Sequence, residues 1–376
     1  MVAAIGTYLL VSTHAASPYA SNEVENGTLA GGANKVTDGT ASGGSYVRFG
    51  SASSSGYTGT CTKTITAATN VGSALSGMSA GQVLCLNSGT YGTISSKNTF
   101  ATSGSAGSPI IITSGPGQTA TLNGAEEITG SNLTFEYLNI DDSNTYYVGN
   151  GGSNPAPCHA PVSDSMNLSG SNITLQYNNI YQSQVSLRAV LIFIYSPGAV
   201  TIRYNKISDA GSCNQTQHLI YDDMSNGAQI YGNWMWNDAY GYAVQLYPAP
   251  SNTKVYSNVI DSTLDGTVDA TSGSGNQTYN NVIENSVVMP GFTSGQMVDC
   301  LGSGGDTVNN NASWNNVRGF GLPCSGVTAT GNITLAADPF VSSSAHNYVL
   351  NANAPDSVKA YGLWDGVGPP SPDPAP

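Results

Sequence analysis

The chain has 376 residues and a formal net charge of -13, and only 9% of its residues are charged. A chain of this length can bury a large core, as one elongated domain or as two compact ones. The 10 Lys and Arg against 23 Asp and Glu argue against nucleic acid as a partner, because phosphate contacts need clustered basic side chains. Polyanionic glycans would also be repelled unless a bound cation offset the field.

The first predicted element is an export signal at residues 1–16. An apolar run from Val2 to Val11 precedes small residues, as in a secretory signal, although a basic start is missing. The run is too short to cross a membrane comfortably, so we interpret it as a signal peptide or a truncated leader, with an uncleaved N-terminal anchor as the alternative. Six cysteines without metal-ligand spacing fit an oxidising compartment. We therefore expect a secreted or cell-surface protein.

The next segment, residues 17–58, contains "EVENGTLAGGANKVTDGTASGGSYVRFG". It resembles the opening strands of β-sandwich carbohydrate-binding modules, which often begin E-x-E-x-G and include S-G-G-x-x-V. Because the segment is far shorter than a whole module, we interpret it as a strand or cap that leads into the following domain. A working sugar site is the alternative.

From residue 59 onward, an asparagine returns at intervals of about 20 to 30 residues, which without helical periodicity predicts a β-solenoid. Successive coils would stack about 4.8 Å apart. Asparagine suits a tight corner because it tolerates left-handed backbone angles, and stacked amides can hydrogen-bond along the column. Leu138 holds the equivalent place in an earlier turn. The recurring residues are Asn178, Asn205, Asn233, Asn258, Asn281, Asn311 and Asn332.

The same stacking predicts disulfides between cysteines one coil apart. Cys61 and Cys85, and likewise Cys300 and Cys324, are separated by 24 residues. Each pair would then fall within the roughly 4.4–6.8 Å Cα separation that a disulfide needs. The remaining cysteines could join two long loops on one side, but that pairing stays open because six cysteines allow fifteen connectivities. They are Cys158 and Cys213.

Motifs from residue 59 onward include the turns "YNNI", "YNKI" and "YSNVI", the segment that begins "HLIYDD", and the ending "ADPFVSSSAHNYVLNANAPDSV" at residues 337–358. On these motifs, the chain resembles right-handed parallel β-helix proteins of the pectate-lyase-like superfamily. The resemblance implies an all-β, right-handed parallel β-helix (a β-solenoid) of roughly 8–11 coils with an N-terminal cap segment. Residues 351–376 would be a closing segment and Pro-rich tail. The order of leader, E-x-E-x-G segment and β-helix also resembles surface proteins of bacteria such as Saccharibacteria.

A second strand is predicted about 14 residues after each asparagine turn, and the last residues of these strands would stack into one row. If the row faces outward, it is a groove of three aromatic rings leading to two carboxylates, which suits sugar stacking and the binding of hydroxyls or cations. The alternative is that the tyrosines fill corners of the coil. The row consists of Tyr195, Tyr221, Tyr247, Asp269 and Asp299.

The densest polar cluster lies around "HLIYDD" and in the coils beside it. Hydrolysis of a glycosidic bond needs two carboxyl groups, about 5–5.5 Å apart for retention or about 6.5–9.5 Å apart for inversion. Asp222 or Asp223, facing Asp238 or Asp209 across one coil, could meet either geometry. The "DD" also resembles a carboxylate pair of polygalacturonases, but their G-H-G and R-I-K motifs are missing. Tyr240 lies in the same cluster.

A lyase would instead need a base, together with Ca²⁺ or an arginine that neutralises the uronate carboxylate. The candidates are Arg188, Arg203, Lys206 and His218, with Asp209, Asp222 and Asp223 to hold Ca²⁺. Arg203 and Lys206 could instead only solvate the stack. His218 would be a core residue if it shares a column with Ile192 and Val244, and would face the groove after a slip of one residue. Ca²⁺ is thus the one cofactor left open.

One further column mixes aromatic and acidic residues and is expected to be a solvated edge. Its Trp236 is a candidate sugar platform, with hydrophobic burial as the alternative. The column contains Asp141, Tyr181, Ser208, Trp236, Asp261, Glu284 and Trp314.

These patterns favour a secreted polysaccharide-active enzyme, hydrolase or lyase, with its site around His218, Asp222, Asp223 and Asp238. The alternatives are a non-catalytic surface protein that binds glycan or a neighbouring cell, and a purely structural stalk. An enzyme should show carboxylates that converge to about 5–10 Å in an open groove, whereas a binding protein should show exposed tyrosines and scattered acids. We expect a polysaccharide partner, no nucleic acid, no membrane beyond an N-terminal anchor, and a monomer.

Overall fold

The computed structural model of the chain separates into two units, residues 1–54 and 55–376. Within the first unit, the structure describes an antiparallel hairpin of β1 (Asn34–Thr37) and β2 (Ser45–Arg48). The described residues are 34–37, 45–48, 56–143, 145, 166–184, 190–211, 217–238, 240–264, 268–270, 273–287, 298–299, 304–322 and 325–366. None of the helices in these ranges is long and apolar enough to span a bilayer.

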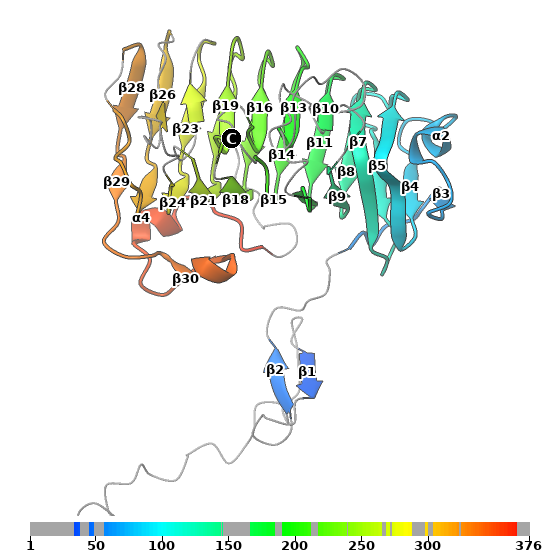
Figure 1. Cartoon of the computed structure of the whole chain (residues 1–376), viewed down its shortest axis with the longest axis horizontal. Helices are drawn as coiled ribbons and strands as arrows, with labels where there is room; N and C mark the ends of the chain where they lie inside the picture. Colours follow the sequence, from blue (N-terminus) through cyan, green and yellow to red (C-terminus); the bar gives the residue numbers. More distant parts are fainter. Residues whose placement is uncertain are drawn as a thin grey trace, which may run out of the picture. The chain divides into compact units, whose positions relative to one another are not determined.

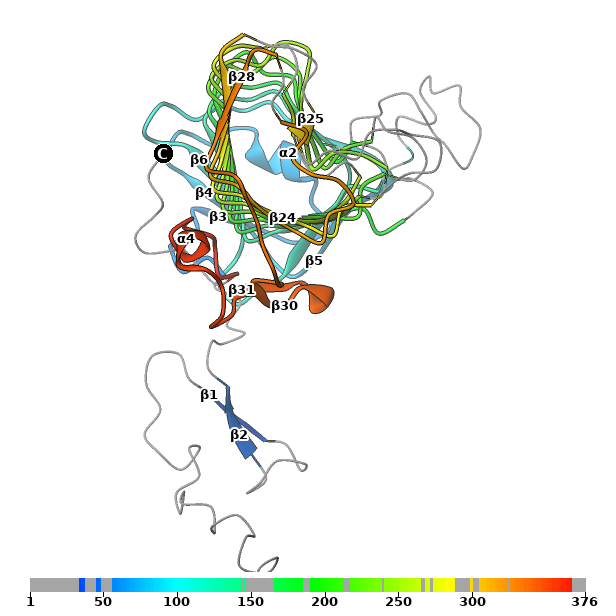
Figure 2. The same ribbon diagram turned by 90° about the vertical axis from the view of Figure 1, so that its left-hand side faces the viewer.

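The second unit is a parallel β-solenoid, whose short strands stack coil upon coil along its length (Figure 1). Figure 2 looks along the stack and shows the sides of the coil, with one helix at the far end. One side is an 11-stranded sheet, and a 16-stranded sheet folds around the other two sides. The expected all-β parallel solenoid is therefore confirmed. About seven turns, rather than the predicted 8–11, carry described strands on all three sides.

The strands fall into three sets, which we name by sheet or by a central strand. The 11-stranded sheet contains β3 (Lys63–Ile65), β4 (Val83–Leu86), β6 (Ile110–Ser114), β8 (Leu133–Glu136), β11 (Ile173–Gln176), β14 (Val200–Arg203), β17 (Gln229–Tyr231), β20 (Lys254–Tyr256), β23 (Gln277–Tyr279), β26 (Asp306–Asn309) and β28 (Val327–Thr330). The β15 face contains β9 (Asn139–Asp141), β12 (Asn179–Tyr181), β15 (Lys206–Ser208), β18 (Trp234–Asp238), β21 (Val259–Thr263), β24 (Val282–Glu284), β27 (Ala312–Trp314) and β29 (Ile333–Thr334). The β16 face contains β10 (Met166–Leu168), β13 (Ile192–Ile194), β16 (Ile220–Asp222), β19 (Val244–Leu246), β22 (Val268–Ala270) and β25 (Val298–Asp299), and long strands β5 (Gly89–Phe100) and β7 (Ala120–Ile128) join the two faces.

The core consists of columns of aliphatic side chains that run along the inside of the stack. Because side chains alternate across a strand, each three-residue strand points its middle or its outer residues inward. The inner column of the β15 face is Ile140, Ile180, Ile207, Met235, Ile260 and Ile283, all buried. At the N-terminal end, helix α2 (Val71–Leu75) buries Val71 and Leu75 against the first coil, and Asn70 caps it by accepting a hydrogen bond from the Ser73 amide.

The recurring asparagines form one continuous ladder, as predicted, and all of them except Asn332 are buried. The Asn233 side chain, for example, accepts hydrogen bonds from the Asn205 amide at 3.0 Å and donates to Asn258 Oδ1 at 3.0 Å and to the Ile202 carbonyl at 2.9 Å. The predicted left-handed residue, however, is the one before the asparagine: φ is 55° at Tyr204 and 53° at Ser257. Each ladder asparagine thus faces inward, and its neighbour makes the corner.

The disulfide between Cys61 and Cys85 is present with a Cα separation of 5.6 Å, which confirms that pairing. It is consistent with an extracellular protein. The other four cysteines, at positions 158, 213, 300 and 324, lie outside the described residues.

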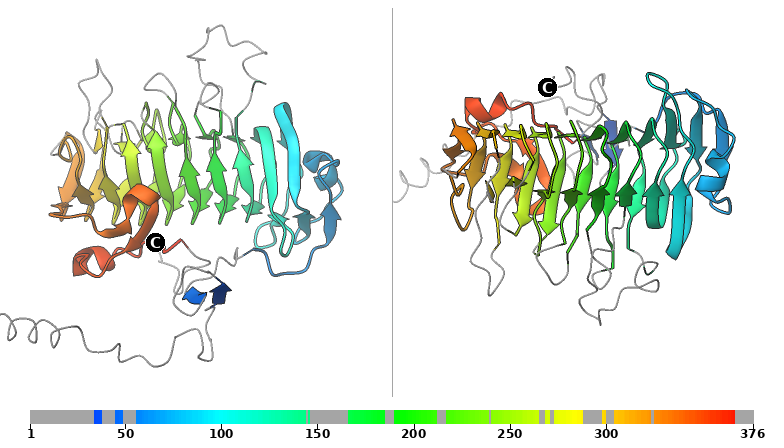
Figure 3. Two further views of the ribbon diagram at one scale, coloured as in Figure 1. Left: turned by 60° about the horizontal axis from the view of Figure 1, so that its bottom comes forward. Right: turned by 90° about the horizontal axis from the view of Figure 1, so that it is seen from above.

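After β29 the chain turns back and packs against the outer side of the β15 face (Figure 3). We call residues 338–366 the C-terminal strap. It contains β30 (Phe340–Ser342), the 3₁₀ turn η4 (Ser343–Ala345), β31 (Asn347–Leu350), antiparallel to β30, and helix α4 (Asp356–Lys359). Its side chains Phe340, Tyr348 and Trp364 pack on Trp234 and Val259, so this face carries a second apolar cluster outside the coil.

Candidate functional site

The outward row of the β16 face starts from Tyr221, which pairs with Phe193 on one side and Gln245 on the other. Backbone register continues this row from Gln245 to Asp269 and Asp299. The predicted pairing of Asp269 with Asp299 is therefore confirmed. The expected alignment of Tyr221 with Tyr195 and Tyr247 is wrong, because those two tyrosines lie two residues further along the chain than the residues that pair with Tyr221.

A second outward row lies at the ends of the same strands. The Asp223 amide donates to the Ile194 carbonyl at 3.0 Å, and the Tyr247 amide donates to the Asp222 carbonyl at 3.0 Å. These bonds continue the ladder by one residue and set Asp223 between Tyr195 and Tyr247. Since residues two apart share a side of a strand, both rows face outward. We call the combined set the outer patch: Phe193, Tyr195, Tyr221, Asp223, Gln245 and Tyr247.

Two aromatic side chains of the outer patch are unusually exposed. Tyr195 is 49% exposed and Tyr247 is 44% exposed, and Met224 beside them is 36% exposed. The rings of Phe193 and Tyr221 stack at 5.0 Å with an interplanar angle of 7°. Phe193 is itself buried, so the accessible aromatic surface is that of Tyr195 and Tyr247, beside the polar Asp223, and a sugar ring can stack on surface of this kind.

The two adjacent carboxylates of "DD" lie on opposite sides of the sheet. Asp223 faces outward and is partly buried, and burial raises its pKa. Asp222 faces inward in the column of Ile194 and Leu246, where its oxygens accept hydrogen bonds from Ser225 and Thr253. Burial raises the pKa of Asp222 to about 6 against the lowering effect of those hydrogen bonds. The pair therefore cannot act together on one substrate.

His218 is completely buried, and its ring stacks on the ring of Tyr221 at 5.7 Å and on that of Tyr242 at 5.3 Å, so it lies beside the outer patch. Ile220, rather than His218, takes the column with Ile192 and Val244. The Nδ1 atom of His218 accepts a hydrogen bond from the Tyr242 amide at 2.9 Å, and burial lowers its pKa to about 3. The ring is thus a neutral acceptor inside the fold over the ordinary pH range.

Asp209 directly follows β15, and Asp238 is the last residue of β18. Both therefore lie where the chain leaves the β15 face and turns towards the β16 face. Asp238 is buried and accepts a hydrogen bond from the Tyr240 amide at 3.2 Å, with the Tyr240 side chain half-buried. Asp209 accepts from Ser208 and Asn237 at a left-handed corner. Asp222 and Asp223 lie instead at the far end of β16. The acids are therefore scattered rather than convergent.

Lys206 and Trp236 lie on the β15 face rather than beside the outer patch. Trp236 stacks on His346 of the C-terminal strap at 4.8 Å. The mixed column that contains Trp236 is not a solvated edge: Asp261 and Glu284 are 3% and 1% exposed because the strap covers them. Arg188 lies outside the described residues, and only the backbone of Asp269 and Asp299 is described.

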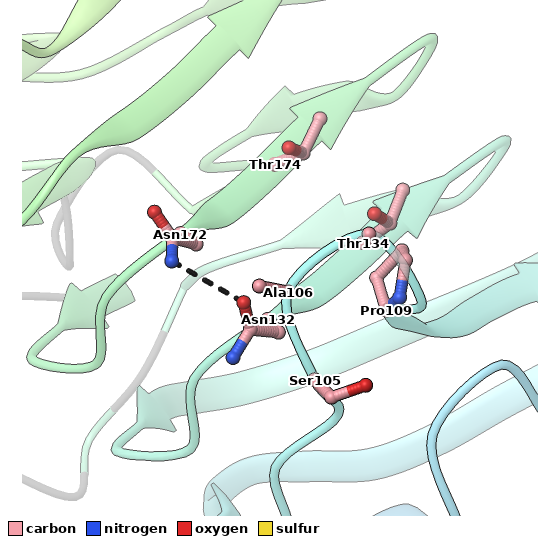
Figure 4. Close-up of a pocket in the computed structure, with 8 residues that line it drawn as sticks. Ser105, Ala106, Pro109, Asn132, Thr134, Asn172 and Thr174 are labelled. Carbon is pink, nitrogen blue, oxygen red and sulfur yellow. Dashed lines mark hydrogen bonds between the residues drawn. The ribbon is translucent and has the colours of Figure 1, made fainter.

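A separate hollow lies on the outer side of the 11-stranded sheet (Figure 4). It has a volume of about 330 Å³ and is lined by neutral side chains, among them Ser105, Thr134 and Thr174, with Asn172 donating to Asn132 at 3.2 Å. In the described part of the chain, no three His, Cys, Asp or Glu side chains converge as they would around a metal ion.

Sequence reasoning missed two members of the outer patch, Phe193 and Gln245. Both lie two residues before a predicted tyrosine, so the alternation of side chains along a strand would have found them. It also missed the contact in which the Tyr348 hydroxyl donates to Asp261 at 2.7 Å. No local pattern signals that bond, because 87 residues separate its partners.

No protein-family model and no curated protein matches the chain. Among solved structures, pectate lyase Pel9A is 13% identical, covering 80% of this chain and 92% of its own, with a TM-score of 0.47. The PL6 family alginate lyase AlyGC is 11% identical over 81% of this chain and 57% of its own, with a TM-score of 0.42. A PL6 family polysaccharide lyase from Pseudopedobacter saltans is 9% identical over 82% and 100%, with a TM-score of 0.39. The chain is a β-solenoid similar to these lyases in structure, and no residue role is transferred from them.

Proposed function

We propose that this protein binds a neutral polysaccharide along the outer side of the β16 face. The observation that carries the proposal is the outer patch, where exposed Tyr195 and Tyr247 flank Asp223 at successive coils. Sugar rings stack on flat aromatic faces, and a carboxylate accepts hydrogen bonds from sugar hydroxyls. None of the six side chains is basic and the chain carries a net charge of -13, so a neutral glycan fits better than a polyanionic one.

Cleavage of the bound glycan at the same surface is the second candidate function. It is favoured by the raised pKa of Asp223, which is a property of general acids, and by the continuation of the outward row to Asp269 and Asp299. Against it stand the inward orientation of Asp222 and the burial of Asp238 and His218. The scattered acids and exposed tyrosines therefore favour binding over catalysis.

The binding proposal predicts that removal of both exposed rings weakens glycan binding. In a panel of immobilised neutral polysaccharides, the double variant Tyr195→Ala, Tyr247→Ala should bind its best glycan at least about tenfold less tightly, since each stacked ring contributes about 1 kcal/mol. Tyr57→Ala, which removes a partly buried tyrosine outside the outer patch, is the matched control and should bind as the wild type does. Equal binding by both variants would remove the outer patch from the site.

The catalytic candidate is tested on the same panel by measuring the release of reducing ends. If the glycan is cleaved at the outer patch, Asp223→Asn should lose turnover while keeping its affinity, because the amide keeps the shape but cannot donate the proton. Asp222→Asn is the matched control, since it changes the inward neighbour. An absence of products from the wild-type chain on every glycan that it binds would leave binding as the function.

Export and surface location belong to the same proposal. Glycan binding through an exposed patch is useful to a cell outside its membrane, and the Cys61–Cys85 disulfide is consistent with that location. The signal at residues 1–16, the domain boundaries and the Saccharibacteria resemblance remain predictions.

A further inference from the structure

The C-terminal end of the solenoid leaves strand edges without partners. β28 and β29 are the last strands of their sheets, and within the described ranges no strand pairs with their outer edges (Figure 1). The carbonyls of Gly326 and Thr330 accept hydrogen bonds from the coil before. Because successive residues of a strand turn their N–H and C=O groups to alternate sides, Val327 and Ala329 turn theirs away from the stack. This edge can therefore pair with another strand.

The same end leaves apolar side chains of the coil interior partly exposed. Ala329 ends the inner column of the 11-stranded sheet that contains Ile230, Val255 and Val308. Those three side chains are completely buried, whereas Ala329 and Val327 in the last coil are half-buried. A layer that covered this end would remove their apolar surface from water, which is favourable.

None of the usual features that keep edge strands apart is present at this end. Natural edge strands are commonly protected by charged side chains, proline or a bulge. Residues 325–334 have the sequence "SGVTATGNIT", which contains no charged residue and no proline, and β28 follows β26 without a shift of register. Since the chain carries a net charge of -13, two copies repel each other over most of their surfaces. This uncharged end is a place where they can meet.

The N-terminal end of the solenoid is closed by comparison. Helix α2 buries Val71 and Leu75 against the first coil, and Lys63 of β3 donates to the Ala74 carbonyl of α2 at 2.6 Å. A head-to-tail contact would have to displace this helix. The C-terminal strap leaves the other end uncovered, because it follows the β15 face and bonds to β18 and β21 of earlier coils.

We infer that two copies of this chain associate through their C-terminal ends, with β28 of one copy antiparallel to β28 of the other. A two-fold axis through Thr328 would set Val327 of each copy opposite Ala329 of the other, and each such pair can exchange both of its N–H···O bonds. The contact uses the same surface on both copies, so it closes at a pair and does not grow into a fibre. The pair departs from the monomer expected from the sequence, and it does not depend on glycan binding.

Analytical ultracentrifugation of the full chain at increasing concentration tests the association. The chain has a mass of 38.6 kDa, and the expected result is a reversible shift from this mass to twice this mass. A denaturing gel without reductant should show the single chain, because the contact contains no disulfide. The mass of a single chain at every concentration, a covalent dimer, or growth beyond two copies would each overturn the inference.

A charged side chain at Thr328 locates the contact. Thr328 is exposed, and the two-fold axis places it directly opposite its own copy. Thr328→Lys should therefore weaken association about fivefold or more, because like charges face each other across the strands. The matched control is Thr201→Lys, in the same outward column but in the middle of the stack, which should associate as the wild type does. Equal weakening by both variants would remove the contact from this end.

Mixing two variants separates a loss of contact from a defect in folding. Thr328→Lys and Thr328→Asp should each associate poorly alone, whereas their mixture sets opposite charges against each other. The mixture should therefore form pairs more tightly than either variant does. A mixture that associates no better than its components would contradict the two-fold axis at Thr328.

Ala329→Pro tests the strand pairing itself. It removes the amide that would donate across the contact, at a strand edge where proline is tolerated. Association should weaken about 10- to 100-fold, because each copy loses one hydrogen bond, and the circular dichroism spectrum should match the wild type. Unchanged association would overturn the pairing. The Tyr195→Ala, Tyr247→Ala variant should still form pairs, because its changes lie on the β16 face; loss of pairing in that variant would place the contact on the outer patch instead.

Discussion

Replacing Asn233 by alanine is expected to lower the free energy of unfolding by about 3–4 kcal/mol. Its side chain is completely buried, accepts two hydrogen bonds from Asn205 and donates to Ile202 and Asn258. Alanine would leave buried donors and acceptors without partners on both neighbouring coils, and each such group costs about 1–3 kcal/mol. Chemical denaturation followed by circular dichroism measures the change.

The matched control is Asn226→Ala, which removes an exposed asparagine from a turn. The one side-chain contact described for Asn226 is with Asn252, which donates to its Oδ1 at 3.0 Å on the surface. Its loss should change the free energy of unfolding by less than about 0.5 kcal/mol. If both variants lost the same stability, the asparagine ladder would contribute no more than a surface amide.

The second large effect is expected at Glu284, under the C-terminal strap. Replacing Glu284 by glutamine should stabilise the protein by on the order of 3 kcal/mol at pH 8. The carboxyl is buried between the coil and the strap, and burial, together with the negative charges of Asp261 and Asp338, raises its pKa to about 9. A neutral amide of the same shape avoids that penalty.

The direction of the pH dependence follows from this raised pKa. Between the ordinary glutamate value, 4.5, and about 9, the folded state binds more protons at Glu284 than the unfolded state does. The stability that Glu284 contributes is therefore complete below 4.5 and falls as the pH rises towards 9. Glu126, whose pKa burial raises to about 8, acts in the same direction, so the informative quantity is the difference between variant and wild type.

Denaturation across this pH range should show the difference between Glu284→Gln and wild type growing with pH. Glu127→Gln is the matched control, because Glu127 is partly exposed and pairs with Lys97 on the surface. That change should cost about 0–1 kcal/mol. A constant difference for Glu284→Gln from acid to alkaline pH would show that its carboxyl titrates as an exposed one.

The sequence predicted the solenoid well because its signal is local and repeated. Every ladder asparagine from Asn178 to Asn332 could be found from spacing alone, and so could the Cys61–Cys85 disulfide. It was harder to predict which side chains of β16 face inward and which face outward, because a strand of three residues gives too few side chains to fix its alignment. Asp222 and Asp223 could thus both be candidates for one site, although the alternation of the strand puts them on opposite sides.

The strap could not be predicted, for a different physical reason. The burial of Asp261 and Glu284 depends on Tyr348 and Asp338, which approach only after the chain has turned back along its own outer surface. The residues next to Asp261 and Glu284 in the sequence do not distinguish these two acids from acids that are exposed to solvent. Long-range packing, rather than spacing, decides their environment.

The path of the C-terminal strap also affects how the solenoid unfolds. Coils of a solenoid contact only their neighbours, so a terminal coil would ordinarily fray one rung at a time. Here the chain that leaves the final rung bonds back to Asp261, to Ser257 and to Trp234, several rungs earlier. These hydrogen bonds join the last coils to the middle of the stack. We therefore expect the C-terminal half to unfold as one cooperative unit.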